Sequence, residues 1–136
     1  MRLRLIRESD LEAVRELRNR SREWFFDDRE VSAAEQRAWF ASLQSKPVSF
    51  YVIEEDGAVV GTISVAERED GFELGNLVLD ERFRGRGLMT GAVEQLSRSG
   101  GTFYARVKPG NDASAAVFER AGFAVRHLHF ERASSP

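Results

Sequence analysis

A basic, glycine-rich stretch over residues 82–91 constrains the fold of this chain more than any other feature; it reads Arg-Phe-Arg-Gly-Arg-Gly-Leu-Met-Thr-Gly. An apolar run (Leu74 to Leu79) precedes it, and apolar residues at helical spacing (Leu88 to Leu96) follow it. This order predicts a strand, a loop and a helix. Glycines let a ligand approach the backbone, the first N–H groups of a helix are unpaired, and the arginines add charged donors. The stretch therefore predicts a phosphate or pyrophosphate site; the alternative is an arginine-rich surface turn.

Two other kinds of phosphate loop do not match this stretch. It has no Gly-Lys-Ser/Thr, as in a P-loop. It also has no Gly-x-Gly-x-x-Gly with an acidic residue about twenty positions on, as in a dinucleotide-binding fold. A phosphate bound here would therefore belong to another kind of ligand.

Composition narrows the function classes further. The formal net charge of −2 gives no basic surface for nucleic acid, and no run of about 18 apolar residues exists for a membrane span. The chain has no cysteine, which excludes disulfides and thiolate metal sites, and its N-terminus lacks the apolar stretch of a signal peptide. We therefore expect a cytoplasmic protein that binds neither nucleic acid nor membrane. His127 and His129 share a strand face but have no third ligand at a suitable spacing, so we expect no metal.

Turn and capping residues divide the chain into elements. Asp56-Gly57 and Asp70-Gly71 lie between apolar runs and predict two tight hairpins. Ser9 with Glu12, and Ser32 with Glu35, predict the starts of two helices. Two further helices are expected over 88–99 and 111–121, and strands over 3–5, 50–53, 59–65, 72–79, 102–107 and 123–130.

These elements predict one mixed α/β (α+β) domain over residues 1–131, followed by a frayed tail over residues 132–136. The helix between the fourth and fifth strands makes those two strands parallel neighbours. The sheet would therefore be central, mixed and mostly antiparallel, with six strands and about four helices. A chain of 136 residues suits one such domain with one core.

With this element order, the chain resembles the GNAT-fold N-acetyltransferases, which depend on acetyl-CoA. Residues 82–87 match that family's [Q/R]-x-x-G-x-[G/A] loop, although in the register that starts at Arg84 the usual Gly or Ala is replaced by Met89. Residues 111–123 match a second family pattern, N-x-x-S-x-x-x-[aromatic]-x-x-x-G-F. The chain is most similar to the branch that includes ribosomal-protein N-terminal acetyltransferases, which also holds many small-molecule acetyltransferases. The resemblance covers roughly residues 2 to 130.

The resemblance implies acetyl-CoA as the acyl donor. Asn111 would hydrogen-bond the pantetheine arm, and Phe118 would pack near the thioester. The pantetheine would also pair with the backbone of Leu77, Val78 and Leu79. The pyrophosphate would be held by the amides of Arg84, Gly85, Arg86, Gly87, Leu88, Met89 and Thr90. Without the resemblance, Asn111 is a helix cap and Phe118 a core residue, and both readings can hold at once.

The resemblance also implies direct attack of a primary amine on the acetyl carbonyl, with no covalent enzyme intermediate. The amine must first lose a proton. Glu73, on the strand before the loop, is the candidate base, and the alternative is an exposed strand carboxylate. The acid that protonates the leaving thiolate must differ from the usual one, because many family members have Tyr where this chain has Phe118, which cannot donate a proton. We predict Ser114 as this donor, with Tyr104 or solvent as the alternatives.

The acceptor would lie between the first two helices and the opening of the fourth and fifth strands. By analogy that region holds Trp24, Phe25, Phe26, Asp27, Asp28 and Glu30. These residues would attract a cationic amine; alternatively, Trp24 and Phe25 are core residues and the acids form a solvated turn. We expect a small amine or an amino sugar as acceptor. A protein N-terminus is the alternative acceptor. A non-catalytic acyl-CoA sensor is the alternative from another class of function. An unpaired sheet edge also predicts a homodimer.

Overall fold

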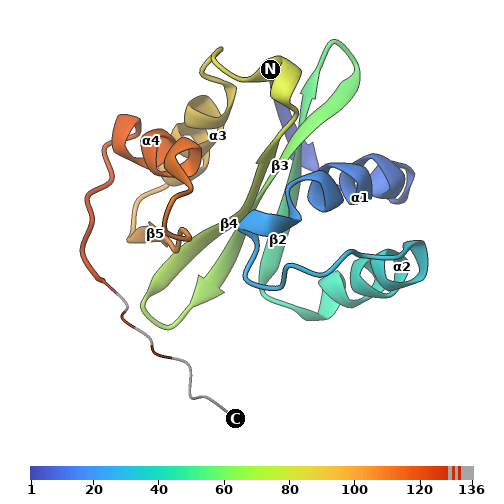
Figure 1. Ribbon diagram of the computed structural model, residues 1–136, viewed down its shortest axis with the longest axis horizontal. Helices are drawn as coiled ribbons and strands as arrows, with labels where there is room; N and C mark the ends of the chain where they lie inside the picture. The colour runs from blue at the N-terminus through green and yellow to red at the C-terminus, as the bar shows by residue number, and fades with distance from the viewer. Residues whose placement is uncertain (129, 131, 133–136) are drawn as a thin grey trace.

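Five strands form one sheet in which the spatial order, β1-β2-β3-β4-β5, is also the order along the chain. The computed structural model describes residues 1–128, 130 and 132 and has helices on both sides of this sheet (Figure 1). The strands are β1 (Arg2–Leu5), β2 (Val48–Glu55), β3 (Ala58–Arg68), β4 (Gly71–Leu79) and β5 (Phe103–Ala105). The α-helices are α1 (Leu11–Arg20), α2 (Ala33–Ser42), α3 (Leu88–Ser97) and α4 (Asp112–Arg120). Short 3-10 turns form η1 (Glu8–Asp10), η2 (Arg22–Trp24), η3 (Leu43–Ser45) and η4 (Glu81–Phe83).

Local sequence signals account for the first hairpin and for the start of α2. Asp56 and Gly57 have positive φ angles of 51° and 80°, as the tight turn between β2 and β3 requires. Ser32 Oγ accepts the Glu35 N–H at 3.1 Å, and the Glu35 carboxylate accepts the Ser32 N–H at 3.2 Å. The capping box predicted for α2 is therefore confirmed.

The start of α1 depends on an ion pair and not on the predicted Ser9–Glu12 box. The Arg4 guanidinium donates to both carboxylate oxygens of Asp10 at 2.8 and 2.9 Å, and to Glu54 at 2.8 Å. Asp10 is only 5% exposed, and its hydrogen bonds with Arg4 lower the pKa of its carboxyl. Removing one partner of such a buried pair typically costs about 3–5 kcal/mol, because the other charge remains buried. The network ties β1 and β2 to the turn that precedes α1.

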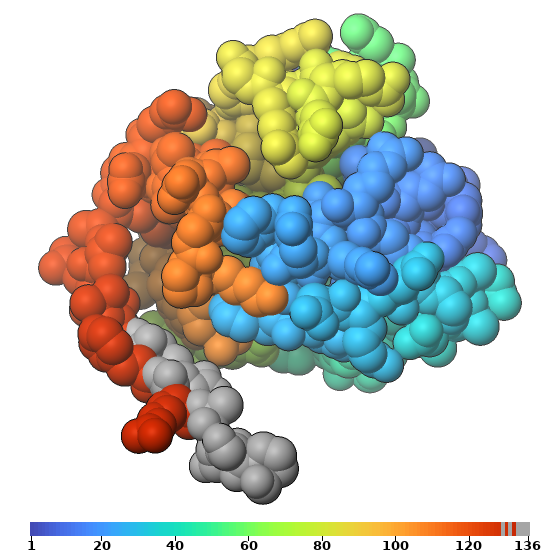
Figure 2. Space-filling model, in the orientation of Figure 1, coloured from blue at the N-terminus to red at the C-terminus, as the bar shows by residue number. Residues whose placement is uncertain are grey.

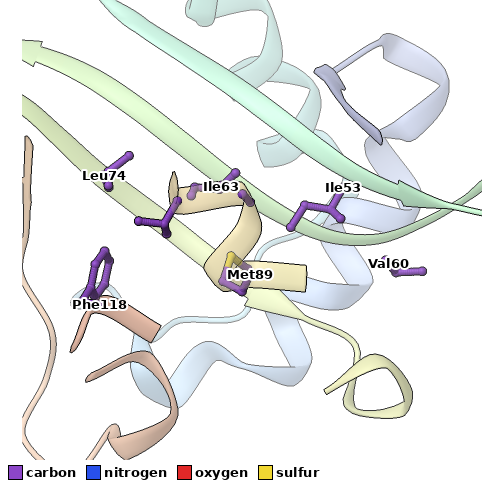
Figure 3. Packing of buried hydrophobic residues seen from close by; sticks show 8 residues of the cluster. Ile53, Val60, Ile63, Leu74, Met89 and Phe118 are labelled. Atoms are coloured by element: carbon purple, nitrogen blue, oxygen red, sulfur yellow. The ribbon is translucent and has the colours of Figure 1, made fainter. Parts of the chain in front are cut away.

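Side chains that alternate along the strands fill two cores, one on each face of the sheet. Val52 and Ile53 are adjacent in β2 and both fully buried, but they belong to different cores. Ile53 packs with residues of α3 and α4, and Figure 3 shows Phe118 of α4 directed toward the same cluster. Val52 packs with Val14 of α1. Each such burial contributes about 1.5–3 kcal/mol, so the two faces hold the helices as separate layers. Every helix in the described residues is too short or too polar to span a bilayer.

β4 and β5 separate after a short parallel pairing. Their register joins residues 72–74 to residues 103–105 only. On its other side β4 has a bulge, where Asn76 adopts a φ of 53° and the register with β3 shifts between Thr62 and Ser64. The Thr62 hydroxyl donates to the Asn76 carbonyl at 2.6 Å, and the Asn76 amide donates to Ser64 Oγ at 2.9 Å. A bulge bends the strand that carries it, so the rest of β4 runs on without a strand on its β5 side.

The sixth strand predicted over residues 123–130 is not present among the described residues. Residues 123–128 and 130 lie outside any strand, and residue 129 is not among those described. Val125, Leu128 and Phe130 are 77, 76 and 88% exposed. An alternating pattern specifies which side chains share a face, but a strand also needs a partner edge, and β5 offers only three residues. Of the tail predicted over 132–136, only residue 132 is described.

Candidate active site

The glycine-rich loop joins β4 to α3 and leaves a run of backbone amides unpaired. Gly85 and Gly87 have φ angles of 79° and 74°, and Gly87 occupies the N-cap of α3. A Cβ added to either glycine would meet no atom within 4 Å, so the space beside the loop is open. In the described part of the chain, no hydrogen bond uses the amides of residues 85–90. These N–H groups and the helix dipole together make a cradle for an anion.

Asp80 anchors the beginning of this loop. Its N–H donates to the Val60 carbonyl at 2.8 Å, and its carboxylate accepts the Arg82 N–H at 3.0 Å. The same carboxylate pairs with the Arg82 guanidinium at 3.0 and 3.2 Å and lies 3.9 Å from Arg20 of α1. The hydrogen bonds with Arg82 lower the pKa of Asp80 to about 2, so it is ionised at neutral pH.

The three arginines of the loop have different surroundings. Arg82 is held by Asp80, and the Arg86 guanidinium lies 5.0 Å from the centre of the Phe83 ring. Arg84 is exposed and has no ion-pair partner among the described residues. The side chains of Arg82 and Arg86 thus contact other loop residues, and the donors of the loop without a partner among the described residues include its backbone amides and the Arg84 guanidinium.

The edge of β4 beyond its bulge carries further unpaired backbone groups. Because the Asp80 N–H points to β3, the alternation of strand backbone directs the amides of Leu77 and Leu79 to the opposite edge. That edge faces the space where β5 has separated from β4. Val78 instead pairs with β3 and is buried. Of the predicted segment 77–79, two residues therefore present backbone groups to the opening.

The residues predicted on α4 lie in its first two turns. Asn111 is the N-cap, and its side-chain oxygen accepts the Ser114 N–H at 3.3 Å. Phe118 is 8% exposed and packs against Phe123, with ring centres 5.2 Å apart. The helix-cap and core interpretations of Asn111 and Phe118 are therefore correct, and the Asn111 amide nitrogen has no partner among the described residues. The Ser114 hydroxyl is likewise unpaired in the described part of the chain.

Glu73 lies on the opposite face of β4 from Leu74 and the α4 core, directly across from Tyr104 of β5. Both its oxygens accept guanidinium N–H groups: Arg68 Nε donates at 3.2 Å and Arg106 Nε at 2.8 Å. Its side chain is only 13% exposed. Desolvation raises the pKa of Tyr104, and the nearby Asp70 carboxylate acts in the same direction. Glu73 thus lies on the other face of the sheet from Phe118, which is one helical turn beyond Ser114, the other predicted catalytic residue.

The segment between α1 and α2 covers the same face. Arg18 of α1 donates to the carbonyls of Asp27 and Arg29, and its guanidinium lies 4.5 Å from the centre of the Phe25 ring. Asn19 exchanges two hydrogen bonds with the backbone of Val31, at 2.8 and 3.0 Å. Two residues of α1 therefore hold this segment in place.

The same segment also contacts the chain that leaves β5. Lys108 Nζ donates to the Glu23 carbonyl at 3.0 Å, and the Arg106 guanidinium lies 5.5 Å from the centre of the Phe26 ring. Figure 2 shows the two segments in contact, one blue and one orange. Trp24 and Phe26 are 39 and 67% exposed, so neither is a core residue.

A pocket of about 330 Å³ lies between this segment and the glycine-rich loop. Arg20 and Trp24 line it from one side, and Leu79, Asp80 and Arg84 from the other. A second pocket, of about 390 Å³, lies at the far end of α3 and includes none of the predicted site residues. Only the first pocket therefore borders the anion cradle.

Three residues of the site were not identified from sequence: Asp80, Asn76 and Arg106. Asn76 follows a glycine inside an apolar strand, and Gly-Asn in that position is a signal for a bulge. Asp80 begins an Asp-x-Arg sequence, in which a short-range ion pair can form. No sequence signal connects Arg106 to Glu73. Among the described residues, which exclude His129, no group of three or more His, Asp or Glu side chains could hold a metal ion.

A family model described as an acetyltransferase (GNAT) domain matches residues 1–124. No curated protein sequence matches the chain significantly. Among solved structures, yncA from Salmonella typhimurium, determined with its cofactor acetyl-CoA, shares 24% identity with this chain. That alignment covers 97% of this chain and 87% of yncA, with a TM-score of 0.77.

Two further solved structures are similar to this chain. A ribosomal-protein-alanine N-acetyltransferase from Brucella melitensis is 23% identical over 90% of this chain and 83% of its own length, with a TM-score of 0.72. RimL, a ribosomal L7/L12 alpha-N-protein acetyltransferase in complex with coenzyme A, is 23% identical over 92% and 80%, with a TM-score of 0.75. At these identities the structural likeness establishes the fold.

Proposed function

The chain belongs to the GNAT acetyltransferase family, and from this premise we propose that it moves the acetyl group of acetyl-CoA to the primary amine of a small molecule or amino sugar. The observation that carries this proposal is the row of amides at residues 85–90, which have no partner among the described residues and continue from the β4 edge that β5 leaves open. A pyrophosphate joined to an extended, amide-containing arm would satisfy both sets of groups. The open space beside Gly85 and Gly87 leaves room for the phosphates.

Acetyl-CoA supplies an activated acyl group whose thiolate is a good leaving group. In this proposal the amides of residues 85–90 bind its pyrophosphate, and the backbone of Leu77 and Leu79 pairs with the pantetheine amides. The free side-chain nitrogen of Asn111 donates to the same arm. Phe118, as part of the core, closes the α4 side of the opening. These groups fix the position of the thioester between β4 and β5, so that a bound amine meets the carbonyl in a constant orientation.

The amine attacks the acetyl carbonyl directly, and a backbone N–H of β4 at the opening stabilises the oxyanion. The attacking amine must be neutral, so its proton leaves before or during attack. Glu73 is the predicted acceptor of that proton. Each oxygen of Glu73 already accepts one guanidinium N–H, so the proton would have to bind at a remaining lone pair of an oxygen that is already hydrogen-bonded. Because Glu73 already holds two guanidinium groups, we expect the proton to pass to water in the opening, with Glu73 as the alternative acceptor. Ser114 is the predicted donor to the thiolate.

Thermal unfolding with acetyl-CoA, CoA or ATP tests the proposal. A ligand at about a hundred times its Kd stabilises the folded state by roughly 2.7 kcal/mol, which is several degrees in Tm for a domain of this size. We expect a shift with acetyl-CoA and CoA and none with ATP. Release of free thiol on addition of amines then tests transfer. Absence of any shift would leave the glycine-rich loop as a surface turn and contradict the proposal.

The same assay separates two other functions. A peptide with a free N-terminus, assayed beside the small amines, tests for a protein acceptor. The names of two structural neighbours include this type of substrate. Faster thiol release with the peptide than with any small amine would favour that acceptor. A shift with acetyl-CoA but no release with any amine would favour an acyl-CoA sensor.

A further inference from the structure

A pair of arginines on the α1 and α2 face of the sheet is oriented by one carboxylate. Glu73 receives the Nε–H of Arg68 at 3.2 Å and the Nε–H of Arg106 at 2.8 Å, one on each oxygen. Glu73 is 13% exposed, whereas Arg68 and Arg106 are 45 and 69% exposed. The carboxylate is thus the sheltered partner, and it holds two guanidinium groups that remain open to solvent.

Most of the donors of these two arginines are unused. In the described part of the chain, Arg68 and Arg106 each make a hydrogen bond through Nε only. The Nη groups of both therefore stay available, and a guanidinium fork matches the two oxygens of a carboxylate or phosphate. Glu73 compensates one of the two guanidinium charges, and Asp70, which lies beside Tyr104, is the further carboxylate near the pair. Through these Nη groups, the pair is suited to bind an anion.

The neighbouring residues make this position part of the acceptor region. The Arg106 guanidinium lies 5.5 Å from the centre of the Phe26 ring, in the segment between α1 and α2. Tyr104 stands across from Glu73, and Lys108 reaches the Glu23 carbonyl from the same segment of chain. Asp70, beside Tyr104, is the carboxylate that opposes these cations. The anion position is therefore bordered by the Phe26 ring.

The acidic segment expected to attract a cation is largely neutralised by its own arginines. Asp27 pairs with Arg29 at 3.0 Å, and Glu30 lies 3.8 Å from Arg22. Of the three acids predicted there, Asp28 alone has no ion pair among the described residues. The acceptor face therefore offers better-organised donors for an anion than acceptors for a cation.

Arg106 also lies at a suitable place along the sheet. It directly follows Ala105, the last residue of β5 that pairs with β4. Asn76, where β4 bends, is three residues beyond Glu73, which is about 10 Å along a strand. A small molecule can span the distance from this arginine pair to the opening between the strands.

We propose that Arg68 and Arg106, oriented by Glu73, form an anion clamp and that the acceptor is an amine that also carries a carboxylate or a phosphate. This inference rests on the acetyltransferase function proposed above and specifies the class of its acceptor. It makes Arg106 a specificity-determining residue and Glu73 a positioning residue. The clamp binds the anionic group of the acceptor, and its amine then lies toward the opening.

Matched pairs of amines test the clamp in a thiol-release assay with acetyl-CoA. One set compares α-amino acids with their carboxamides, and a second compares glucosamine 6-phosphate with glucosamine. In one of the two sets, we expect the charged amine to have a kcat/KM at least tenfold above that of its neutral partner. A preference in the first set identifies the anion as a carboxylate, and a preference in the second identifies it as a phosphate. In Arg106→Gln this preference should fall roughly ten- to a hundredfold, which is the scale of one charge-assisted hydrogen bond. The fall should come from a higher KM for the charged member of the pair.

Three variants complete the design. Arg68→Gln should weaken the same preference, and Arg106→Lys should retain part of it. Arg98→Gln, at an exposed position after α3, should behave as the wild type. The preference for charged over neutral acceptors is the deciding quantity, because a purely structural role of the arginines would change both members of a pair together. Acetyl-CoA-dependent stabilisation of each variant shows that it is folded and binds the donor.

Several results would overturn the clamp. One is equal or faster reaction of the neutral members, and another is a preference that survives in both Arg106→Gln and Arg68→Gln. If no amine reacts, the same pairs are compared as ligands that stabilise the CoA-loaded protein; equal responses then overturn the clamp as well. The proposed transferase function fails separately, when acetyl-CoA itself does not stabilise the wild type.

Discussion

The Asp80 carboxylate accepts the Nε–H and an Nη–H of Arg82 at 3.2 and 3.0 Å, at the point where β4 ends and the glycine-rich loop begins. The same carboxylate caps η4 by accepting the Arg82 backbone N–H. Because Asp80 is also bonded to β3 through the Val60 carbonyl, the loop starts from a constant position on the sheet. The proposed pyrophosphate cradle therefore depends on a residue that would not touch the ligand.

We expect Asp80→Asn to weaken acetyl-CoA binding and to change the pH dependence of stability. The pKa of Asp80 is lowered from an ordinary value near 3.8 to about 2 in the folded protein. Its ion pair therefore stabilises the fold above about pH 4, and this contribution is lost as pH falls through about 2. Tm measured from pH 6 to pH 2 should fall less steeply in the variant than in the wild type. Parallel curves would contradict the assignment.

Gly87→Ala should reduce binding of CoA more than it reduces stability. Gly87 has a φ of 74°, where a Cβ lowers the stability of the fold by about 1–2 kcal/mol. A change of backbone angle that relieves this strain would reorient the amides of the cradle. Gly57→Ala is a matched control, because Gly57 has a φ of 80°, open space around it and a place in the distant β2–β3 turn. Both variants should lose similar stability in urea. Only Gly87→Ala should lose the CoA-dependent shift in Tm.

Ser114→Ala tests the predicted donor to the leaving thiolate. A general acid typically contributes on the order of 10²–10⁴ in rate, so kcat should fall by at least that lower value while the acetyl-CoA shift is kept. Ser99→Ala, at an exposed position after α3, serves as the control. Full kcat in Ser114→Ala with acetyl-CoA still bound would exclude this role and leave solvent or Tyr104 as donor.

Glu73→Gln distinguishes a base from a positioning residue. As the base, Glu73 would be required for every acceptor, and its loss would lower kcat/KM for charged and neutral amines alike. As the residue that orients Arg68 and Arg106, it would matter chiefly for anionic acceptors. We expect the second pattern. A uniform loss across all acceptors would instead support the base.

A homodimer remains a prediction, and the exposed apolar residues after α4 offer a way to test it. Val125 and Leu128 are 77 and 76% exposed, and β5 has no second partner strand within the described residues. Size-exclusion chromatography with light scattering should give twice the 15.4 kDa mass of the chain. Val125→Glu combined with Leu128→Glu should give the monomer mass. A monomer at micromolar concentration in the wild type would contradict the prediction.

Local patterns identified most of the fold because they act over a few residues. Asp-Gly turns, the Ser32–Glu35 capping box and the glycine-rich loop are all short-range signals, and the structure has each of them. The two errors come from elements whose partners are distant. The α1 cap depends on Arg4 of β1, and the strand expected over 123–130 has no paired edge among the described residues.

The candidate site divides in the same way. Gly85, Gly87 and Asn111 have the backbone positions that their motifs imply, since a loop and a helix cap are made within one segment. The surroundings of Glu73 could not be read from sequence, because Arg106 is 33 positions away. Nor could the contact between Lys108 and Glu23, which are 85 positions apart.

By itself, then, the sequence determined the family, the order of elements and the backbone cradle, because periodicity, turns and caps each depend on near neighbours in the chain. Only the tertiary structure decided what surrounds the acceptor. The parallel pairing of β4 with β5 brings Glu73 beside Arg106, and the Arg106 guanidinium lies 5.5 Å from the centre of the Phe26 ring. Charges that are scattered along the chain thereby become one cluster, and in our proposal the balance of that cluster selects the acceptor.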